Sequence, residues 1–247
     1  MTSQTKRLPR HFYRMPPRPC PYLAGRTEQN IFTELTGPDS PTMYDTLTHA
    51  GFRRSHNIAY RPVCPGCNAC VSVRVLVRAF RPSRSHRRVL RANRDLVGRE
   101  RPASATLEHY RLFARYVSVR HDDGEMADMN FADYAAMVEE SPLSTSILEF
   151  RDTGGTLMAA CLVDRLRDGL SAVYSFFEPA EERRGLGNFM VLRLIELSRE
   201  LGLPYLYLGY WIAGSRKMAY KSRFRPLEAL GPNGWKRVPD HEALGGL

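Results

Sequence analysis

The second half of the chain alternates between apolar runs and turn residues in a way that predicts a β-meander. Three strands are expected at residues 145–150, 156–163 and 170–177, where apolar side chains dominate. Turn-forming pairs, Gly154-Gly155 and Asp168-Gly169, separate these runs. Consecutive strands joined by such short turns pair in antiparallel fashion.

A helix, a strand and a short helix are expected after the meander. Residues 186–201 carry apolar side chains at helical spacing, and Gly202 marks the end of this helix. Residues 204–212 then predict a strand, and residues 217–224 a short helix. This order of elements is typical of the GNAT-type acyltransferase fold.

The turn before the long helix contains Gly185 and Gly187. Glycines at this place let backbone N–H groups approach a phosphate at the helix N-terminus. Glu182, however, stands where an Arg or Gln normally precedes the first glycine by three residues. This exchange argues against a standard acetyl-CoA pyrophosphate loop.

The first half of the chain has a different character. Helices are expected around residues 27–36 and 42–49, a strand at 71–77, and further helices at 104–120 and 130–140.

The sequence therefore predicts an α/β (α+β) protein of two parts. Residues 104–247 form a GNAT-like acyltransferase domain, and residues 1–103 form a smaller N-terminal region rich in Cys and Arg.

The most basic segment, residues 81–94, predicts a helix that begins after Ser83 as N-cap. Its arginines recur at steps of three and four, which places most of them on one helical face. They are Arg81, Arg84, Arg87, Arg88, Arg91 and Arg94. A charge run is usually a solvated face, but such a face mixes signs, and residues 74–94 contain no Asp or Glu. The pattern favours contact with nucleic-acid phosphates.

Composition agrees with this interpretation. The net charge of +10 and the pI near 9.6 favour a polyanionic partner. No run approaches the roughly 18 apolar residues of a membrane span, and the N-terminus has no apolar signal region. We therefore expect a cytoplasmic protein with no membrane partner.

Several segments together resemble the arginyl-tRNA–protein transferase family. In the first half they are CPYLAGR (20–26), GFRRS (51–55), YRPVCPGCNAC (60–70) and the Arg-rich stretch. In the second half they are YSFFEP (174–179), RGLGNFMVLRLIE (184–196) and LGLPYLYLGYWIAGSRKMAYKSRF (201–224). The chain is most similar to the short bacterial branch of the family, the aspartate/glutamate leucyltransferases, over about residues 10 to 235.

The resemblance implies a reaction and its partners. Leucine would pass from leucyl-tRNA to the N-terminal α-amine of proteins that begin with Asp or Glu, which marks them for degradation in the N-degron pathway. No cofactor is required for this transfer. Eukaryotic relatives use arginyl-tRNA instead, and the sequence itself does not show the donor amino acid.

Candidates for the chemistry cluster where a GNAT-like sheet would open. They are Tyr174, Glu178, Tyr210, Trp211, Lys217 and Tyr220. Of these, Glu178 is the candidate to accept the amine proton and Tyr210 the candidate to orient the ester. The alternative is that the tyrosines pack in the core and that Glu178 only begins a turn before Pro179.

Selection of an acidic acceptor requires a cation that reaches a short carboxylate. The candidates beside the expected cleft are Arg216, Lys217, Lys221 and Arg223. Arg53 or Arg54 is expected to reach the cleft from the other half.

Three cysteines, Cys64, Cys67 and Cys70, have a spacing suited to zinc or an iron–sulfur cluster, with Cys20 as a fourth ligand. In eukaryotic relatives the position of Cys20 begins a Cys-x-x-Cys pair, whereas here the second position is Leu23. The alternative is a set of reduced thiols at a tight turn. Cys161 lies in an apolar strand and is expected in the core.

Two other functions remain open at this point. An acetyl-CoA-dependent N-acetyltransferase would explain the second half but not the arginines or the cysteines. A zinc-containing RNA-binding module would explain those features but not the acyltransferase-like half.

Overall fold

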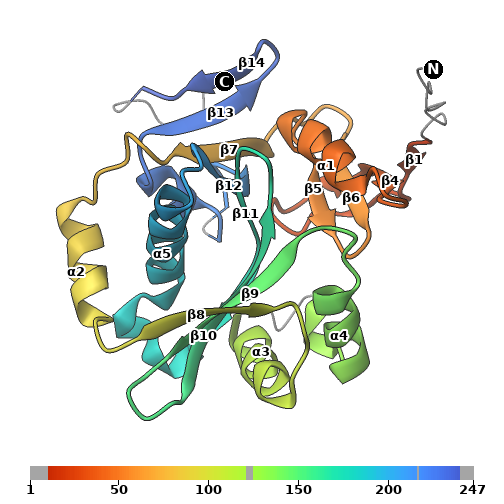
Figure 1. The fold of residues 1–247 in the computed structure, drawn as a ribbon. Coiled ribbons are helices and arrows are strands. Elements are labelled where there is room, and N and C mark those ends of the chain that lie inside the picture. The colour runs from red at the N-terminus through yellow and green to blue at the C-terminus, as the bar shows by residue number, and fades with distance from the viewer. Residues whose placement is uncertain (1–10, 121–124, 216, 240–247) are drawn as a thin grey trace, which may run out of the picture.

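An eight-stranded mixed sheet forms the centre of the molecule (Figure 1). The structure is a computed structural model that describes residues 11–120, 125–215 and 217–239 of the 247-residue chain. The strands follow the order β14-β13-β7-β12-β11-β10-β9-β8, and only β11 and β12 run parallel to each other. Their bounds are β7 Val71–Leu76, β8 Val97–Pro102, β9 Thr145–Arg151, β10 Leu157–Arg165, β11 Gly169–Phe177, β12 Tyr205–Trp211, β13 Leu227–Gly231 and β14 Gly234–Arg237.

The predicted meander is confirmed as β9, β10 and β11, which pair antiparallel in sequence order. Helix α5 (Leu186–Glu200) then leads to β12, as the GNAT-like order predicts. The fold class expected from the sequence, α/β with a GNAT-like second half, is therefore confirmed.

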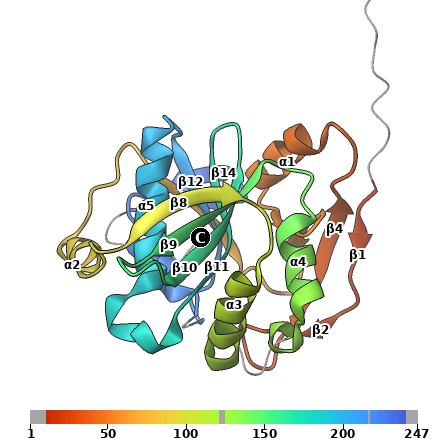
Figure 2. The same cartoon turned by 60° about the horizontal axis from the view of Figure 1, so that its bottom comes forward.

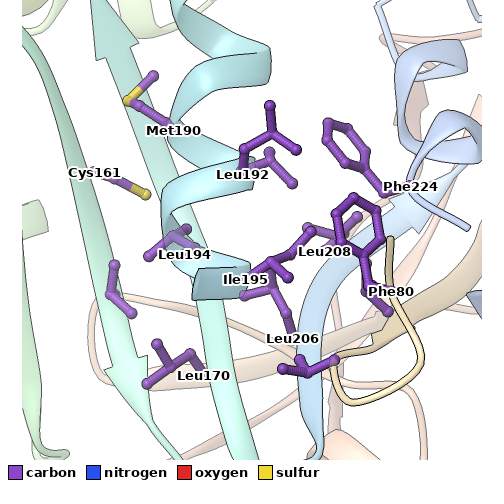
Figure 3. Packing of buried hydrophobic residues seen from close by; sticks show 14 of the residues in the cluster. Phe80, Cys161, Leu170, Met190, Leu192, Leu194, Ile195, Leu206, Leu208 and Phe224 are labelled. Carbon is purple, nitrogen blue, oxygen red and sulfur yellow. The ribbon is translucent and has the colours of Figure 1, made fainter. Parts of the chain in front are cut away.

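Helices cover both faces of the sheet (Figure 2). Helix α5 packs on one face, and α3 (Leu107–Arg120) and α4 (Phe131–Glu139) pack on the other. Strand β10 lies between these layers, and its residues 157–164 are all buried. In Figure 3, Met190 and Leu194 of α5 lie near Cys161, which confirms Cys161 as a core residue at 1% exposure.

The N-terminal region contains a separate four-stranded sheet of order β1-β4-β6-β5. Its elements are β1 Tyr13–Arg14, β4 Asn30–Glu34, β5 Arg53–Ser55 and β6 Ile58–Pro62, with helix α1 Ser40–His49 and a small hairpin of β2 Arg18–Pro19 and β3 Thr27–Glu28. Tyr44 and Leu47 of α1 pack with Tyr207 of β12. The small sheet thus lies against the large one.

The helix expected around residues 27–36 is wrong, because the chain forms β3 and β4 there. The apolar run is short, so the positions of Ile31, Phe32 and Leu35 fit the periodicity of a helix and that of a strand equally well. Pairing decides the outcome, since β4 lies between β1 and β6 and both neighbours bond to its backbone.

The large sheet also takes strands from the N-terminal region. Strand β7 lies between β12 and β13, and β8 pairs with β9 at the edge. The sheet therefore crosses the boundary expected at residues 103/104. Strand β8 has no apolar alternation, and all six of its residues are exposed, so no sequence pattern predicted it.

The remaining elements are short or helical. Helix α2 is Arg84–Ala92, and the 3₁₀-helices are η1 Glu125–Asp128, η2 Pro179–Arg184 and η3 Ala219–Arg223. The short helix expected at 217–224 is thus η3. Within the described residues, no helix combines the length and apolar character needed to cross a bilayer.

Candidate active site

Strands β11 and β12 separate toward their carboxyl ends. They pair only from Gly169 opposite Tyr205 to Ser171 opposite Tyr207, although both strands continue well beyond this point. A gap between the carboxyl ends of neighbouring parallel strands is where open α/β sheets bind ligands. The candidate site is built around this gap.

Arg53 enters the gap from β5 of the small sheet. Its Nη2 donates to the carbonyls of Ala172 and Val173 on β11, at 3.0 Å and 2.9 Å. Its Nη1 donates to the carbonyl of Leu208 on β12, at 3.2 Å. The guanidinium therefore takes the place of the main-chain hydrogen bonds that the two strands no longer make to each other.

Lys221 and Tyr210 lie on the β12 side of the gap. Lys221, in η3, is 5% exposed, and its Nζ donates to the carbonyl of Tyr210 at 2.6 Å. Burial, and then the charge of Arg53, lower the pKa of Lys221 well below its usual value. The Tyr210 hydroxyl lies 2.9 Å from the carbonyl of Gly51 and 3.2 Å from that of Tyr60. Tyr210 thus fixes β12 to the small sheet.

Two buried donors near the gap have no hydrogen-bond partner among the described residues. They are the Trp211 indole Nε1, in the core on the α5 face of the sheet, and the Tyr174 hydroxyl, which packs on the face covered by α3 and α4. Burial raises the pKa of Tyr174, so that its hydroxyl stays protonated. A buried donor without a partner costs about 1–3 kcal/mol, and a bound substrate oxygen would relieve that cost.

The two residues predicted for catalysis do not contact each other in the described part of the chain. Glu178 follows β11 and accepts from Arg115 of α3 at 2.8 Å and 3.2 Å. Its other oxygen accepts from Ala180 N at 3.4 Å, which caps η2. The Glu178 carboxylate is 22% exposed, and the residue directly follows the carboxyl end of β11.

The four cations predicted for acceptor binding have different surroundings. Lys221 is buried in the site, whereas Lys217 and Arg223 are exposed. Arg223 lies near α2, where burial and then the Arg223 charge lower the pKa of His86. Arg216 lies outside the described residues.

The predicted basic helix is confirmed as α2. Ser83 is its N-cap and accepts from His86 N at 3.2 Å. All six predicted arginines are exposed, and none forms a salt bridge with a carboxylate of the described residues. The nearby acid Asp95 is held by Arg184 at 2.6 Å. The arginine face therefore remains available to phosphate oxygens.

Four cysteines gather beside the site. Cys20 lies at the β2–β3 hairpin, and Cys64, Cys67 and Cys70 lie between β6 and β7. Burial, and then the other three thiols, raise the pKa of Cys70 to about 12. Thiols that influence one another are a donor set suited to zinc or iron. Even so, no three His, Cys, Asp or Glu side chains of the described ranges are arranged as metal ligands.

Comparison with known proteins identifies the family. Residues 18–88 match the family model "Arginine-tRNA-protein transferase, N terminus", and residues 108–231 match "Arginine-tRNA-protein transferase, C terminus". The chain belongs to the arginine-tRNA-protein transferase family. The resemblance drawn from the sequence motifs is thereby confirmed.

Two relatives in this family show its bacterial branch. The chain is 56% identical over 229 residues to an aspartate/glutamate leucyltransferase of Paramagnetospirillum magneticum. The aligned region covers 93% of this chain and 94% of the relative. It is 55% identical over 239 residues to the enzyme of the same name from Parvibaculum lavamentivorans, covering 97% and 99%.

The fold of this family member is also found outside the family. L-PGS from Bacillus licheniformis superposes with a TM-score of 0.50 at 11% identity, over 71% of this chain and 62% of that one. At that identity the likeness concerns the fold alone.

Gly209 of this transferase is a further residue of the site, and no sequence motif had assigned it a role. It has φ +71° and lies at a bulge in the register of β12 with β7. A signal was present, since a glycine inside an apolar strand marks a bulge or a close approach of another group.

Proposed function

We propose that this chain transfers leucine from leucyl-tRNA to the N-terminal α-amine of proteins that begin with Asp or Glu. The observation that carries the proposal is the 53–56% identity to aspartate/glutamate leucyltransferases over nearly the whole chain. The reaction would take place in the cytoplasm and mark the acceptors for degradation.

The chemistry needs no nucleophile from the protein. The acceptor amine attacks the ester carbonyl carbon, a C–N bond forms, and the C–O bond to the terminal ribose breaks. The proton lost by the amine ends on the ribose oxygen. An α-amine has a pKa of about 7.7–8.0, so roughly a tenth is uncharged near pH 7. Positioning alone can supply effective molarities of about 10⁵ M or more.

The residues around the gap suit the remaining tasks. One of the two unpartnered donors, Tyr174 or Trp211, would bind the ester oxygen as it becomes an oxyanion, a contribution of about 10²–10³-fold. Glu178, which directly follows the carboxyl end of β11, would accept the amine proton, and Tyr210 would hold β12 in place. The cation that binds the acidic side chain of the acceptor would come from the set Lys217, Lys221, Arg223 and Arg216.

The tRNA would lie along α2. Its exposed arginines have no competing carboxylates, and phosphate contacts of this kind make affinity dependent on salt. Because Arg223 of η3 lies near His86 of α2, this surface is continuous with the segment that carries Lys221.

We also propose that the thiolates of Cys20, Cys64, Cys67 and Cys70 bind zinc or an iron–sulfur cluster. Their grouping supports this proposal, and coordination would require the side chains to turn toward a common centre. The transfer mechanism above uses no step at this centre.

The direct test supplies three donors in parallel: leucyl-tRNA, arginyl-tRNA and acetyl-CoA, each with a radiolabelled acyl group. The acceptors are peptides that differ only in a first residue of Asp, Glu or Ala. Label from leucyl-tRNA on the Asp and Glu peptides alone is expected. Label from acetyl-CoA would replace this proposal with an acetyltransferase.

A further inference from the structure

We propose that Arg53 and Lys221 together form the subsite that binds the side-chain carboxylate of the acceptor's first residue. This inference rests on the proposed function, because it names the part of the site that selects an acidic acceptor. It narrows a broad set of basic residues to two cations in the gap between β11 and β12.

The two cations are held close together by one strand. Arg53 Nη1 donates to the carbonyl of Leu208, and Lys221 Nζ donates to that of Tyr210. These carbonyls flank Gly209, so the two side chains approach β12 on either side of one residue. Burial lowers the pKa of Lys221, and the nearby positive charge of Arg53 lowers it further.

Neither cation is neutralised by a carboxylate of the described residues. Their hydrogen bonds there go to four main-chain carbonyls. Burial acts to lower the pKa of Arg53, but four tyrosine side chains near it act to raise that pKa, and they prevail; they are Tyr60, Tyr44, Tyr210 and Tyr22.

The two buried arginines beside these elements, in contrast, are paired with carboxylates. Arg54, the next residue in the chain, makes a two-bond ion pair with Asp164, and both side chains are 0% exposed. Arg74 pairs with Glu228 at 2.7 Å. A charge that is taken out of water without a counterion is costly, and the lowered pKa of Lys221 reflects that cost. A carboxylate bound from outside would pair with the partly buried Arg53 and favour the charged form of Lys221.

Donors remain for that anion. A guanidinium has five N–H groups, of which Arg53 uses three, and an ammonium has three, of which Lys221 uses one. A carboxylate accepts several such bonds, and charge-assisted bonds in a buried site are strong. An acceptor with a neutral first residue would leave both cations without a carboxylate partner. The site would therefore discriminate against such acceptors.

The same pair would assist the reaction. Positive charges near the acceptor's α-ammonium disfavour its protonated form and so lower its pKa. A larger fraction of the bound amine is then uncharged and nucleophilic.

The test compares peptides that begin with Asp and with Asn, which have nearly the same shape but differ in charge. Lys221→Met keeps the length of the side chain and removes the charge. We expect the ratio of kcat/KM for Asp over Asn to fall at least about 10-fold, through loss on the Asp peptide alone. Lys236→Met, an exposed position on β14, is the matched control and should leave the ratio unchanged.

Binding of the same two peptides without tRNA separates this inference from the proposed function. If the wild-type protein transfers no leucine to either peptide, the proposed function fails, and the binding preference still tests the subsite. An Asp-over-Asn preference that survives in Lys221→Met, in a folded protein, overturns the inference.

A crystal structure of the wild-type protein with an Asp-initiated peptide decides the matter if Lys221→Met does not fold. The side-chain carboxylate should lie within hydrogen-bonding distance of Arg53 or Lys221. A carboxylate bound elsewhere contradicts the inference.

Discussion

The guanidinium of Arg53 occupies the space that a side chain at position 209 would need. A Cβ built on Gly209 would lie 1.4 Å from Nη1 of Arg53 and 2.2 Å from its Cζ. The positive φ of Gly209, +71°, also disfavours any other residue. The GFRRS and LGYWI segments, more than 150 residues apart, are thus fitted to each other at the centre of the site.

Gly209→Ala is expected to damage both stability and transfer. The added methyl group must displace Arg53 from the carbonyls of β11 and β12, and overpacking of this kind typically costs about 1–3 kcal/mol. Urea unfolding and leucyl-transfer rates measure the two effects. Gly202→Ala is the matched control, because Gly202 has the same φ of +71° with nothing within 4 Å of its Cβ position. Equal effects at both positions would show that backbone strain, rather than Arg53, is responsible.

Glu178→Gln should lower kcat about 10²-fold or more while leaving tRNA affinity unchanged, because a general base contributes roughly 10²–10⁴-fold. Single-turnover transfer to an Asp peptide measures this. Glu182→Gln, an exposed carboxylate in the adjacent η2, serves as the control. If the activity of Glu178→Gln stays within about twofold of the wild type, Glu178 is not the general base. Its role is then only the structural one of bonding to Arg115 and capping η2.

Reversal of Arg87, Arg88 and Arg91 to Glu should weaken tRNA binding by at least about 10-fold at moderate salt. Each lost phosphate contact also reduces the slope of log K against log salt by about 0.9. Filter binding across a salt series measures both quantities. The same reversal at Arg14, Arg165 and Arg167, exposed arginines outside α2, controls for net charge. Equal losses in the two triple variants would reject α2 as the specific contact.

The fold was largely predictable from the sequence where the apolar pattern was long and its period unambiguous. The meander, α5 and β12 satisfy that condition, and so does α2, because Ser83 and the arginine spacing fix its start and its face. Strands β4 and β8 were not predictable, since pairing with distant segments decides them.

The candidate site was predictable only in part. The motifs indicated Tyr210, Lys221 and the adjacent pair Arg53 and Arg54. The local sequence pattern does not determine which of these two arginines reaches the gap. Arg53 binds strand carbonyls, whereas Arg54 is neutralised by Asp164. That difference arises from a contact across more than 100 residues of chain.

Protein purified without oxygen is expected to contain zinc or iron at about one site per chain, because four thiols gather beside the active site. Elemental analysis together with an absorption spectrum distinguishes zinc from a cluster. Replacement of Cys67 and Cys70 by Ser should remove the metal, whereas Cys161→Ala, in the core, should retain it. Metal content well below one per chain in the wild type contradicts this prediction.

The activity proposed for this chain is the addition of leucine to an acidic N-terminus. The most direct measurement is mass spectrometry of an Asp-initiated protein after incubation with the purified enzyme and leucyl-tRNA, with an Ala-initiated version alongside. We predict one added leucine residue, located by fragmentation at the α-amine of the Asp-initiated protein alone. An unmodified product from both proteins, or leucine on both to the same extent, would show that the chain does not have this activity.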